Sequence, residues 1–235
     1  MDLLPGYEIY IDESNTPIFK TNKQRRESPY AVCAIAISIL DKKRIENLLP
    51  RDETGGLMKF SSLGLTDGTV SQFLDGILES DILFSLVGLD TSAEENCQFA
   101  ELLTDTANQH RRKKIKQSNL MYARVAAEAI IAIYGSNRLS FFDIIFDSNS
   151  LPKNEFNLLK NILKDKFAKR GVIIREITRK TEQQEPLLLA ADIIAGVGRR
   201  WDTHQDVPQS WGKIIKGQKL GKVIIRNGIE VYNAG

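Results

Sequence analysis

Apolar runs with the alternation and the β-branched or aromatic content of β-strands occur at five places along the chain. The first, Tyr7 to Asp12, alternates, is rich in Ile and Tyr, and ends in a polar, turn-prone cluster. The other four occupy residues 30–40, 81–89, 139–147 and 172–178. The pattern therefore predicts three early strands and two late ones.

Segments with helical spacing lie between and after these strands. The clearest covers residues 152–170, where Phe156, Leu159, Leu163 and Phe167 recur on one face. A helix over 186–201 has a proline in its first turn, which is a favoured position. Other helical segments are 41–49, 70–80 and 92–134, the last interrupted near the basic run 111–116. The main elements are predicted in the order β-β-β-α-β-α-β-α.

Early strands in a meander, followed by alternating helix and strand, predict an α/β fold with a mixed sheet and helices on its faces. Three antiparallel strands with two parallel additions form the ribonuclease H-like order, which we therefore expect here. We expect one domain over residues 1–235, with its core at about 7–201 and a C-terminal extension at 202–235. Asn227-Gly228 between two apolar runs predicts a β-hairpin in that extension.

Composition narrows the class of protein only a little. The chain has 235 residues, a formal net charge of +2 and 26% charged residues, which is ordinary for a globular protein and neither indicates nor excludes nucleic-acid binding. Its two cysteines have no paired spacing, so we expect no zinc site or disulfide and a reducing, cytoplasmic location. No signal peptide and no membrane-spanning run is expected.

Two aspartates share the same local context. Asp12 and Asp147 each end an apolar strand and precede a short polar turn. If these strands run side by side, both carboxylates reach the same edge of the sheet, where ligands of open α/β sheets bind. Because Asp also favours turns after strands, each residue alone is explained by turn formation, and the pair leaves both interpretations open.

Asp192 gives a sharper signal, since it lies in the apolar segment 187–196. A charge within such a helix is costly unless it is paired, protonated or bound to a metal. The structural alternatives are an ion pair with Arg199 or Lys180, or a solvated notch. We favour the functional interpretation, because small neighbours such as Ala191 and Gly196 let this helix approach the sheet closely.

Carboxylates from two strand ends and a helix suit Mg²⁺ or Mn²⁺, which prefer oxygen ligands. Two such ions about 4 Å apart can activate a water and stabilise the leaving oxygen in phosphodiester cleavage. Glu128, a single charge in an apolar helix, and Glu13 are candidates for a fourth carboxylate. Glu128 is equally explained as a partly exposed residue, and strand alternation points Glu13 away from Asp12 unless the strand has already ended.

Three segments carry a resemblance to a known family. Residues 9–14, Ile-Tyr-Ile-Asp-Glu-Ser, resemble the N-terminal Tyr-Ile-Asp-Glu-Ser signature of the domain-of-unknown-function 3800 (DUF3800) family. Residues 146–148 are similar to its central acidic strand end, and residues 189–196 to its Leu-Gln-x-Ala-Asp-x-x-Ala-Gly helix. The chain departs from the pattern at Asn15, where Gly is usual, and at Ala190, where Gln is common.

The resemblance implies a ribonuclease H-like fold and a metal-dependent nuclease or related phosphoryl-transfer enzyme, tied to mobile elements or phage defence. Lys59-Phe60-Ser61 is similar to a Lys- or His-containing motif between the second and third strands of that family. It implies that Lys59 contacts a phosphate or the charge that develops on it.

Basic residues cluster at three places, which are residues 20–26, 111–116 and 213–222. Cationic patches beside an acidic crevice suit a nucleic acid, DNA or RNA, since they neutralise its backbone. For any single run, a solvated surface is the favoured explanation.

The leading hypothesis is an Mg²⁺- or Mn²⁺-dependent phosphodiesterase acting on RNA or DNA. Asp12, Asp147 and Asp192 hold the metal in this hypothesis, with Glu13 or Glu128 as an additional ligand. The alternatives are a catalytically inactive nucleic-acid- or protein-binding module on the same fold, and a metal-dependent hydrolase of a small phosphorylated substrate.

Overall fold

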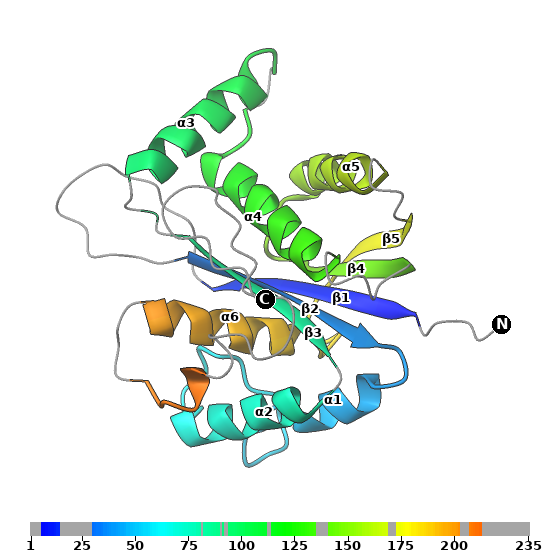
Figure 1. Ribbon diagram of the computed structural model, residues 1–235, viewed down its shortest axis with the longest axis vertical. Coiled ribbons are helices and arrows are strands. Elements are labelled where there is room, and N and C mark those ends of the chain that lie inside the picture. The colour runs from blue at the N-terminus through cyan, green and yellow to red at the C-terminus, as the bar shows by residue number, and fades with distance from the viewer. Residues whose placement is uncertain are drawn as a thin grey trace.

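A mixed β-sheet forms the centre of the computed structural model (Figure 1). The structure describes residues 6–14, 30–80, 82–89, 91, 94–111, 114–134, 141–168, 173–202 and 207–212. Within these residues the sheet has five strands in the order β3-β2-β1-β4-β5. The strands are β1 (Tyr7–Ser14), β2 (Tyr30–Ser38), β3 (Leu83–Leu89), β4 (Phe141–Asp147) and β5 (Ile173–Lys180).

The pairing of the strands divides the sheet into an antiparallel half and a parallel half. β2 pairs antiparallel with both β1 and β3, whereas β4 pairs parallel with both β1 and β5. Ile11 of β1 lies between Ala34 of β2 and Phe146 of β4. This is the ribonuclease H-like order that the sequence predicts, and it places the carboxyl ends of β1, β4 and β5 at one edge.

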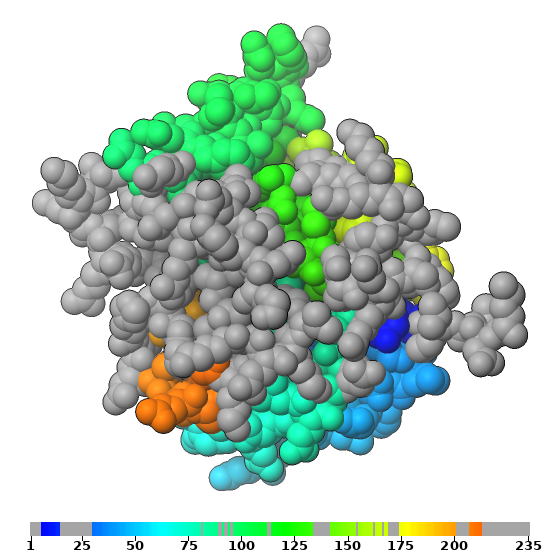
Figure 2. All heavy atoms as spheres, viewed as in Figure 1, coloured from blue at the N-terminus to red at the C-terminus, as the bar shows by residue number. Residues whose placement is uncertain are grey.

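Helices cover both faces of the sheet (Figure 1). α6 lies on one face together with α1 and α2, and α4 and α5 lie on the other, with α3 packed against α4. In the space-filling view the two groups occupy opposite ends of the molecule (Figure 2). The helices are α1 (Lys42–Leu48), α2 (Asp67–Glu79), α3 (Glu94–Asn108), α4 (Gln117–Tyr134), α5 (Lys153–Ala168) and α6 (Leu188–Asp202).

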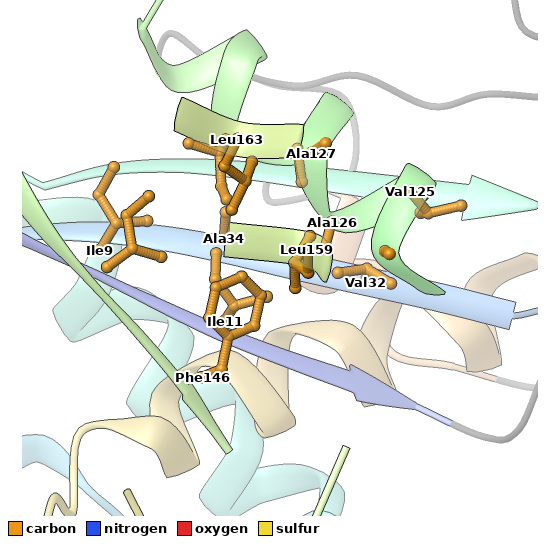
Figure 3. Close-up of a cluster of buried hydrophobic side chains, with 14 of the residues drawn as sticks. Ile9, Ile11, Val32, Ala34, Val125, Ala126, Ala127, Phe146, Leu159 and Leu163 are labelled. Atoms are coloured by element: carbon orange, nitrogen blue, oxygen red, sulfur yellow. The ribbon is translucent and has the colours of Figure 1, made fainter. Parts of the chain in front are cut away.

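Each face of the sheet has its own apolar core, because successive strand residues point to opposite faces. Figure 3 shows the core under α4 and α5, where Ile9, Ile11 and Phe146 meet Ala126 and Leu163. The alternate residues of the same strands form the second core, against α6 and α2. It includes Tyr10, Cys33, Ile35, Ile145 and Ile194.

The structure differs from the sequence prediction at the ends of several elements. β1 continues two residues beyond Asp12, since Glu13 and Ser14 still pair with β2. The segment predicted as a loop at 51–69 ends in the first residues of α2, which Thr66 caps by accepting a hydrogen bond of 3.1 Å from the Thr69 amide. A side-chain cap of this kind satisfies an amide that has no partner within the helix.

The C-terminal extension is described only at residues 207–212. Trp211 is buried there, and its indole N–H donates a hydrogen bond of 3.0 Å to Ser71 of α2. Its ring packs edge-on against Phe60, with centroids 6.4 Å apart. This part of the extension therefore supports the segment that carries Lys59 and Phe60. The predicted hairpin around Asn227-Gly228 lies outside the described residues.

Gly196 allows α6 to approach the Phe60 ring closely. A Cβ at Gly196 would lie 2.2 Å from a ring carbon of Phe60, so Gly196→Ala must displace that ring. We expect the free energy of unfolding to fall by about 1–3 kcal/mol, the usual cost of overpacking. Thermal unfolding measures the change. The control is Gly68→Ala in α2, whose Cβ would meet only Thr66 Oγ1 at 3.6 Å. A Gly196→Ala protein as stable as Gly68→Ala would contradict this account of the packing.

Candidate metal centre

Three carboxylates meet at the edge where the parallel strands end. One oxygen each of Asp12, Asp147 and Glu182 lies within 4.8 Å of the other two. Asp12 is close to the end of β1, Asp147 is the last residue of β4, and Glu182 follows β5 by two residues. Since the three strands are neighbours and parallel, their ends deliver these side chains to the same place. The structure thus brings the predicted pair Asp12 and Asp147 together.

Asp12 is buried among like charges. Its side chain alternates with Tyr10 and faces α6, and the residue is 6% exposed. Burial raises the pKa of Asp12 well above its usual range, and the charges of Glu13, Asp192 and Asp147 raise it further. A hydrogen bond from the Glu13 amide opposes this shift in the pKa. The negative form of Asp12 is therefore unfavourable unless a cation lies nearby.

Asp192 on α6 borders the cluster. Its carboxylate accepts a hydrogen bond of 2.8 Å from the Phe60 amide. Burial raises the pKa of Asp192 and the charge of Glu182 adds to this, while the Phe60 amide, Lys59 and Arg199 act in the opposite direction. The sequence also allowed an ion pair between Asp192 and Lys180. In the structure Lys180 pairs with Glu185 instead, at 2.9 Å. The negative charge of Asp192 also raises the pKa of Asp12.

Glu13 points to the opposite face of the sheet from Asp12, as strand alternation predicts. There it accepts a hydrogen bond of 2.7 Å from Ser150, in the turn that follows β4. Burial raises the pKa of Glu13 to about 7; the Ser150 hydroxyl lowers it, and the charges of Asp147 and Asp192 raise it. Glu13 therefore adds negative charge beside the cluster from the α4 side.

Lys59 supplies a positive charge at the cluster. Its ammonium lies 2.5 Å from Glu182, and its side chain is 50% exposed. Burial lowers the pKa of Lys59, but the hydrogen bond and charge of Glu182, with the charges of Asp192 and Asp147, outweigh this, and the pKa is raised. Lys59 therefore carries its proton throughout the physiological range and partly balances the carboxylates.

The structure does not bring Glu128 to the cluster. Glu128 forms an ion pair of 2.9 Å with Arg124, one turn earlier on α4. α4 covers the sheet face that carries Ile9 and Ile11, whereas Asp12 faces α6 on the other side. We therefore leave Glu128 out of the candidate site. Helix periodicity could not distinguish the two faces, because the α4 segment is apolar nearly all round.

Glu182 is the residue of the cluster that the sequence interpretation missed. It has a signal similar to that of Asp12 and Asp147, an acidic residue at or close to the end of a strand. The signal was obscured because the predicted strand ended at residue 178, whereas β5 continues through Arg179 and Lys180. Because Arg179 and Lys180 are basic, the sequence pattern there resembles the beginning of a loop rather than the end of a strand.

A buried ionic network fixes the segment that carries Glu182. Glu185, 7% exposed, accepts a hydrogen bond of 2.9 Å from Lys180 and pairs with Lys42 at 3.4 Å. The Tyr10 hydroxyl, two residues before Asp12 on β1, donates to the same carboxylate at 3.4 Å. Glu182 is therefore held between β5 and a carboxylate that is tied to the sheet.

The comparisons with known proteins add only a general likeness. No family model matches the chain, and no curated protein matches it. Two crystal structures of Bst-RNase HIII are similar, one of a point mutant and one in complex with Mn²⁺. They are 14% and 13% identical, each with a TM-score of 0.49, and they are matched over 91% of this chain. The match covers 64% and 63% of those chains, so this chain spans less than two thirds of their length.

The strand order β3-β2-β1-β4-β5 by itself defines the ribonuclease H-like arrangement of this sheet.

Among the described residues, no helix has the length and apolar character needed to cross a membrane.

The repulsion at Asp12 predicts a pH-dependent stability. Because the folded pKa of Asp12 is raised, its ionisation costs stability, and this cost grows as pH rises from the unfolded pKa through the folded one. Without metal, Asp12→Asn should unfold several degrees above wild type at pH 8, equivalent to about 1–2 kcal/mol, and differ less at pH 5.

Thermal unfolding in a chelator at both pH values measures this effect. Asp165→Asn on the exposed side of α5 is the matched control, since it removes the same charge away from the cluster. Equal shifts of the two variants, or the same shift at both pH values, would contradict the electrostatic account.

Proposed function

We propose that this protein is a divalent-metal-dependent nuclease, a phosphodiester hydrolase acting on DNA or RNA. The observation that carries the proposal is the meeting of Asp12, Asp147 and Glu182 oxygens within 4.8 Å at the carboxyl edge of three parallel strands. Asp12 and Asp147 are buried and Glu182 is partly buried, and carboxylates this close together in such surroundings are unfavourable without a cation. A cluster that keeps its carboxylates together despite this repulsion is suited to binding a cation.

The donor set fits Mg²⁺ or Mn²⁺. All the donors are carboxylate oxygens, which hard cations prefer, and within the described part of the chain the cluster includes no thiolate or imidazole that would favour zinc. Asp12, Asp147 and Glu182 would hold the ion, with Asp192 as a neighbouring ligand. Glu13 would act from the opposite face, through its negative charge or as a further ligand. When bound, the metal supplies the charge that lowers the pKa of a water and stabilises oxyanions on phosphorus.

Lys59 has a separate role in the proposal. Its side chain is half exposed and its ammonium lies beside Glu182, so its donors can reach a phosphate oxygen of a substrate at the cluster. The Phe60 amide holds Asp192, which ties the orientation of Lys59 to that of α6. The DUF3800 resemblance supports the same proposal, because its motifs supply Asp12, Asp147, Asp192 and Lys59.

Mn²⁺ binding by calorimetry tests the metal centre. We expect wild type to bind and Asp147→Asn and Glu182→Gln each to bind at least tenfold more weakly, since each replaces an anionic carboxylate with a neutral amide. Glu176→Gln is the control, an exposed carboxylate of β5 outside the cluster. Circular dichroism verifies that all variants are folded.

Cleavage of labelled DNA, RNA and hybrid strands with Mg²⁺ or Mn²⁺ tests the activity. Loss of cleavage in Asp147→Asn and Glu182→Gln, but not in Glu176→Gln, is the expected result. If wild type binds no Mn²⁺, even with an oligonucleotide present, the metal centre is wrong. Mn²⁺ binding without cleavage of any strand would leave a binding module, and cleavage of small phosphodiesters alone would indicate a small-molecule hydrolase.

A further inference from the structure

The beginning of α4 lies beside the end of the sheet that carries the carboxylate cluster of Asp12, Asp147 and Glu182. Tyr122, in the second turn of α4, packs edge-on against Phe146, the residue before Asp147, with ring centroids 6.3 Å apart. Asn119, in the first turn, donates a hydrogen bond to Glu155 of α5, the helix that follows the Asp147 turn. A helix rises about 1.5 Å per residue, so Lys116 lies only about 9 Å along the axis from Tyr122.

The described residues that precede α4, 108–111 and 114–116, are joined to each other by hydrogen bonds. The Asn108 side chain bonds Ile115 in both directions, donating to its carbonyl at 3.0 Å and accepting from its amide at 2.8 Å. Ile115 is buried, 7% exposed, and anchors the turn in the core. Its neighbours Lys114 and Lys116 are exposed, so the anchor presents two cations to solvent.

The cations of this turn differ from several other cations among the described residues. Lys42, Lys59, Arg124, Arg175, Lys180 and Arg200 each form an ion pair with a carboxylate. Among the described residues, no carboxylate pairs with Arg111, Lys114 or Lys116, and Arg111 donates to the Ala107 carbonyl instead. Arg112 and Lys113 add to the run but lie outside the described residues. Within the described part of the chain, Arg111, Lys114 and Lys116 therefore carry positive charge that no carboxylate balances by an ion pair.

We propose that Arg111, Lys114 and Lys116, in the basic turn before α4, bind the phosphate backbone of a nucleic acid whose scissile phosphate lies at the carboxylate cluster. This rests on the proposed function and extends it by assigning the surface that holds the strand. These three cations, which pair with no described carboxylate, can neutralise phosphates without first breaking an ion pair to a described residue. The acidic edge alone would repel a polyanion, so a cationic surface close to it is needed to hold the strand.

Fluorescence anisotropy with a labelled oligonucleotide, in a chelator and over a range of salt concentrations, tests the turn. The variant is Arg111→Gln/Lys114→Gln/Lys116→Gln. At low salt we expect its affinity to fall tenfold or more. The slope of log K against log salt should decrease by about 2–3, since each phosphate that is no longer neutralised reduces it by about 0.7–0.9.

The matched control is Lys43→Gln/Arg44→Gln/Arg51→Gln, three exposed cations at and just beyond α1, on the α6 side of the sheet. It removes the same charge and should keep the wild-type affinity and salt slope. Thermal unfolding confirms that both triple variants are folded.

Mn²⁺ calorimetry on the same variants separates this proposal from the metal centre. Weaker nucleic-acid binding with unchanged Mn²⁺ binding supports the turn. Wild-type affinity in the turn variant, or equal losses of affinity in the turn and control variants, overturns the proposal whatever the metal centre does. If wild type binds no oligonucleotide at low salt, the turn proposal also fails, and a turn-dependent interaction with an acidic protein would then replace it.

Discussion

Parallel pairing of β1 with β4, and of β4 with β5, is the constraint on which the carboxylate cluster depends. Parallel neighbours end at the same edge, so acidic residues at those ends must meet there. An antiparallel pairing of β4 would have moved Asp147 to the far end of the sheet. The crossover helix α5 makes the parallel pairing of β4 with β5 possible, because parallel strands need a connection that returns along the sheet. The fold therefore determines which carboxylates can act together.

The cluster is balanced by contacts that come from elsewhere in the chain. Lys59 neutralises Glu182, and the Phe60 amide satisfies Asp192; both belong to the segment between β2 and α2. That segment is in turn supported by Trp211 and by the close approach of the Phe60 ring to Gly196. Packing around Phe60 thus contributes directly to the electrostatics of the site. If the cluster binds a cation as proposed, the repulsion between its carboxylates lowers stability in return for that binding.

The sequence pattern predicted the order of the strands and indicated that Asp12, Asp147 and Asp192 lie near one another. Strand patterns locate the first two residues, and an isolated charge in an apolar helix locates the third. Glu182 was missed because its strand ends in Arg179 and Lys180, which carry no apolar signal. Glu128 was included because its apolar helix gives no indication of which sheet face it covers. The network around Glu185 depends on contacts between distant segments, such as Tyr10 with Glu185, and no local pattern encodes these.

The adjacent residues Asp12 and Glu13 connect the two faces of the sheet. Asp12 points towards α6 and the metal-binding candidates, and Glu13 points towards α4 and bonds Ser150. Tyr122 stands on the same side as Glu13, at the end of α4 that follows the basic turn. Because a strand alternates its side chains, two consecutive acids at the end of β1 place negative charge on both faces. A polyanion that approaches this end of the sheet would meet negative charge on either face. The proposed contacts of Arg111, Lys114 and Lys116 with phosphates, just before α4, would offset this repulsion.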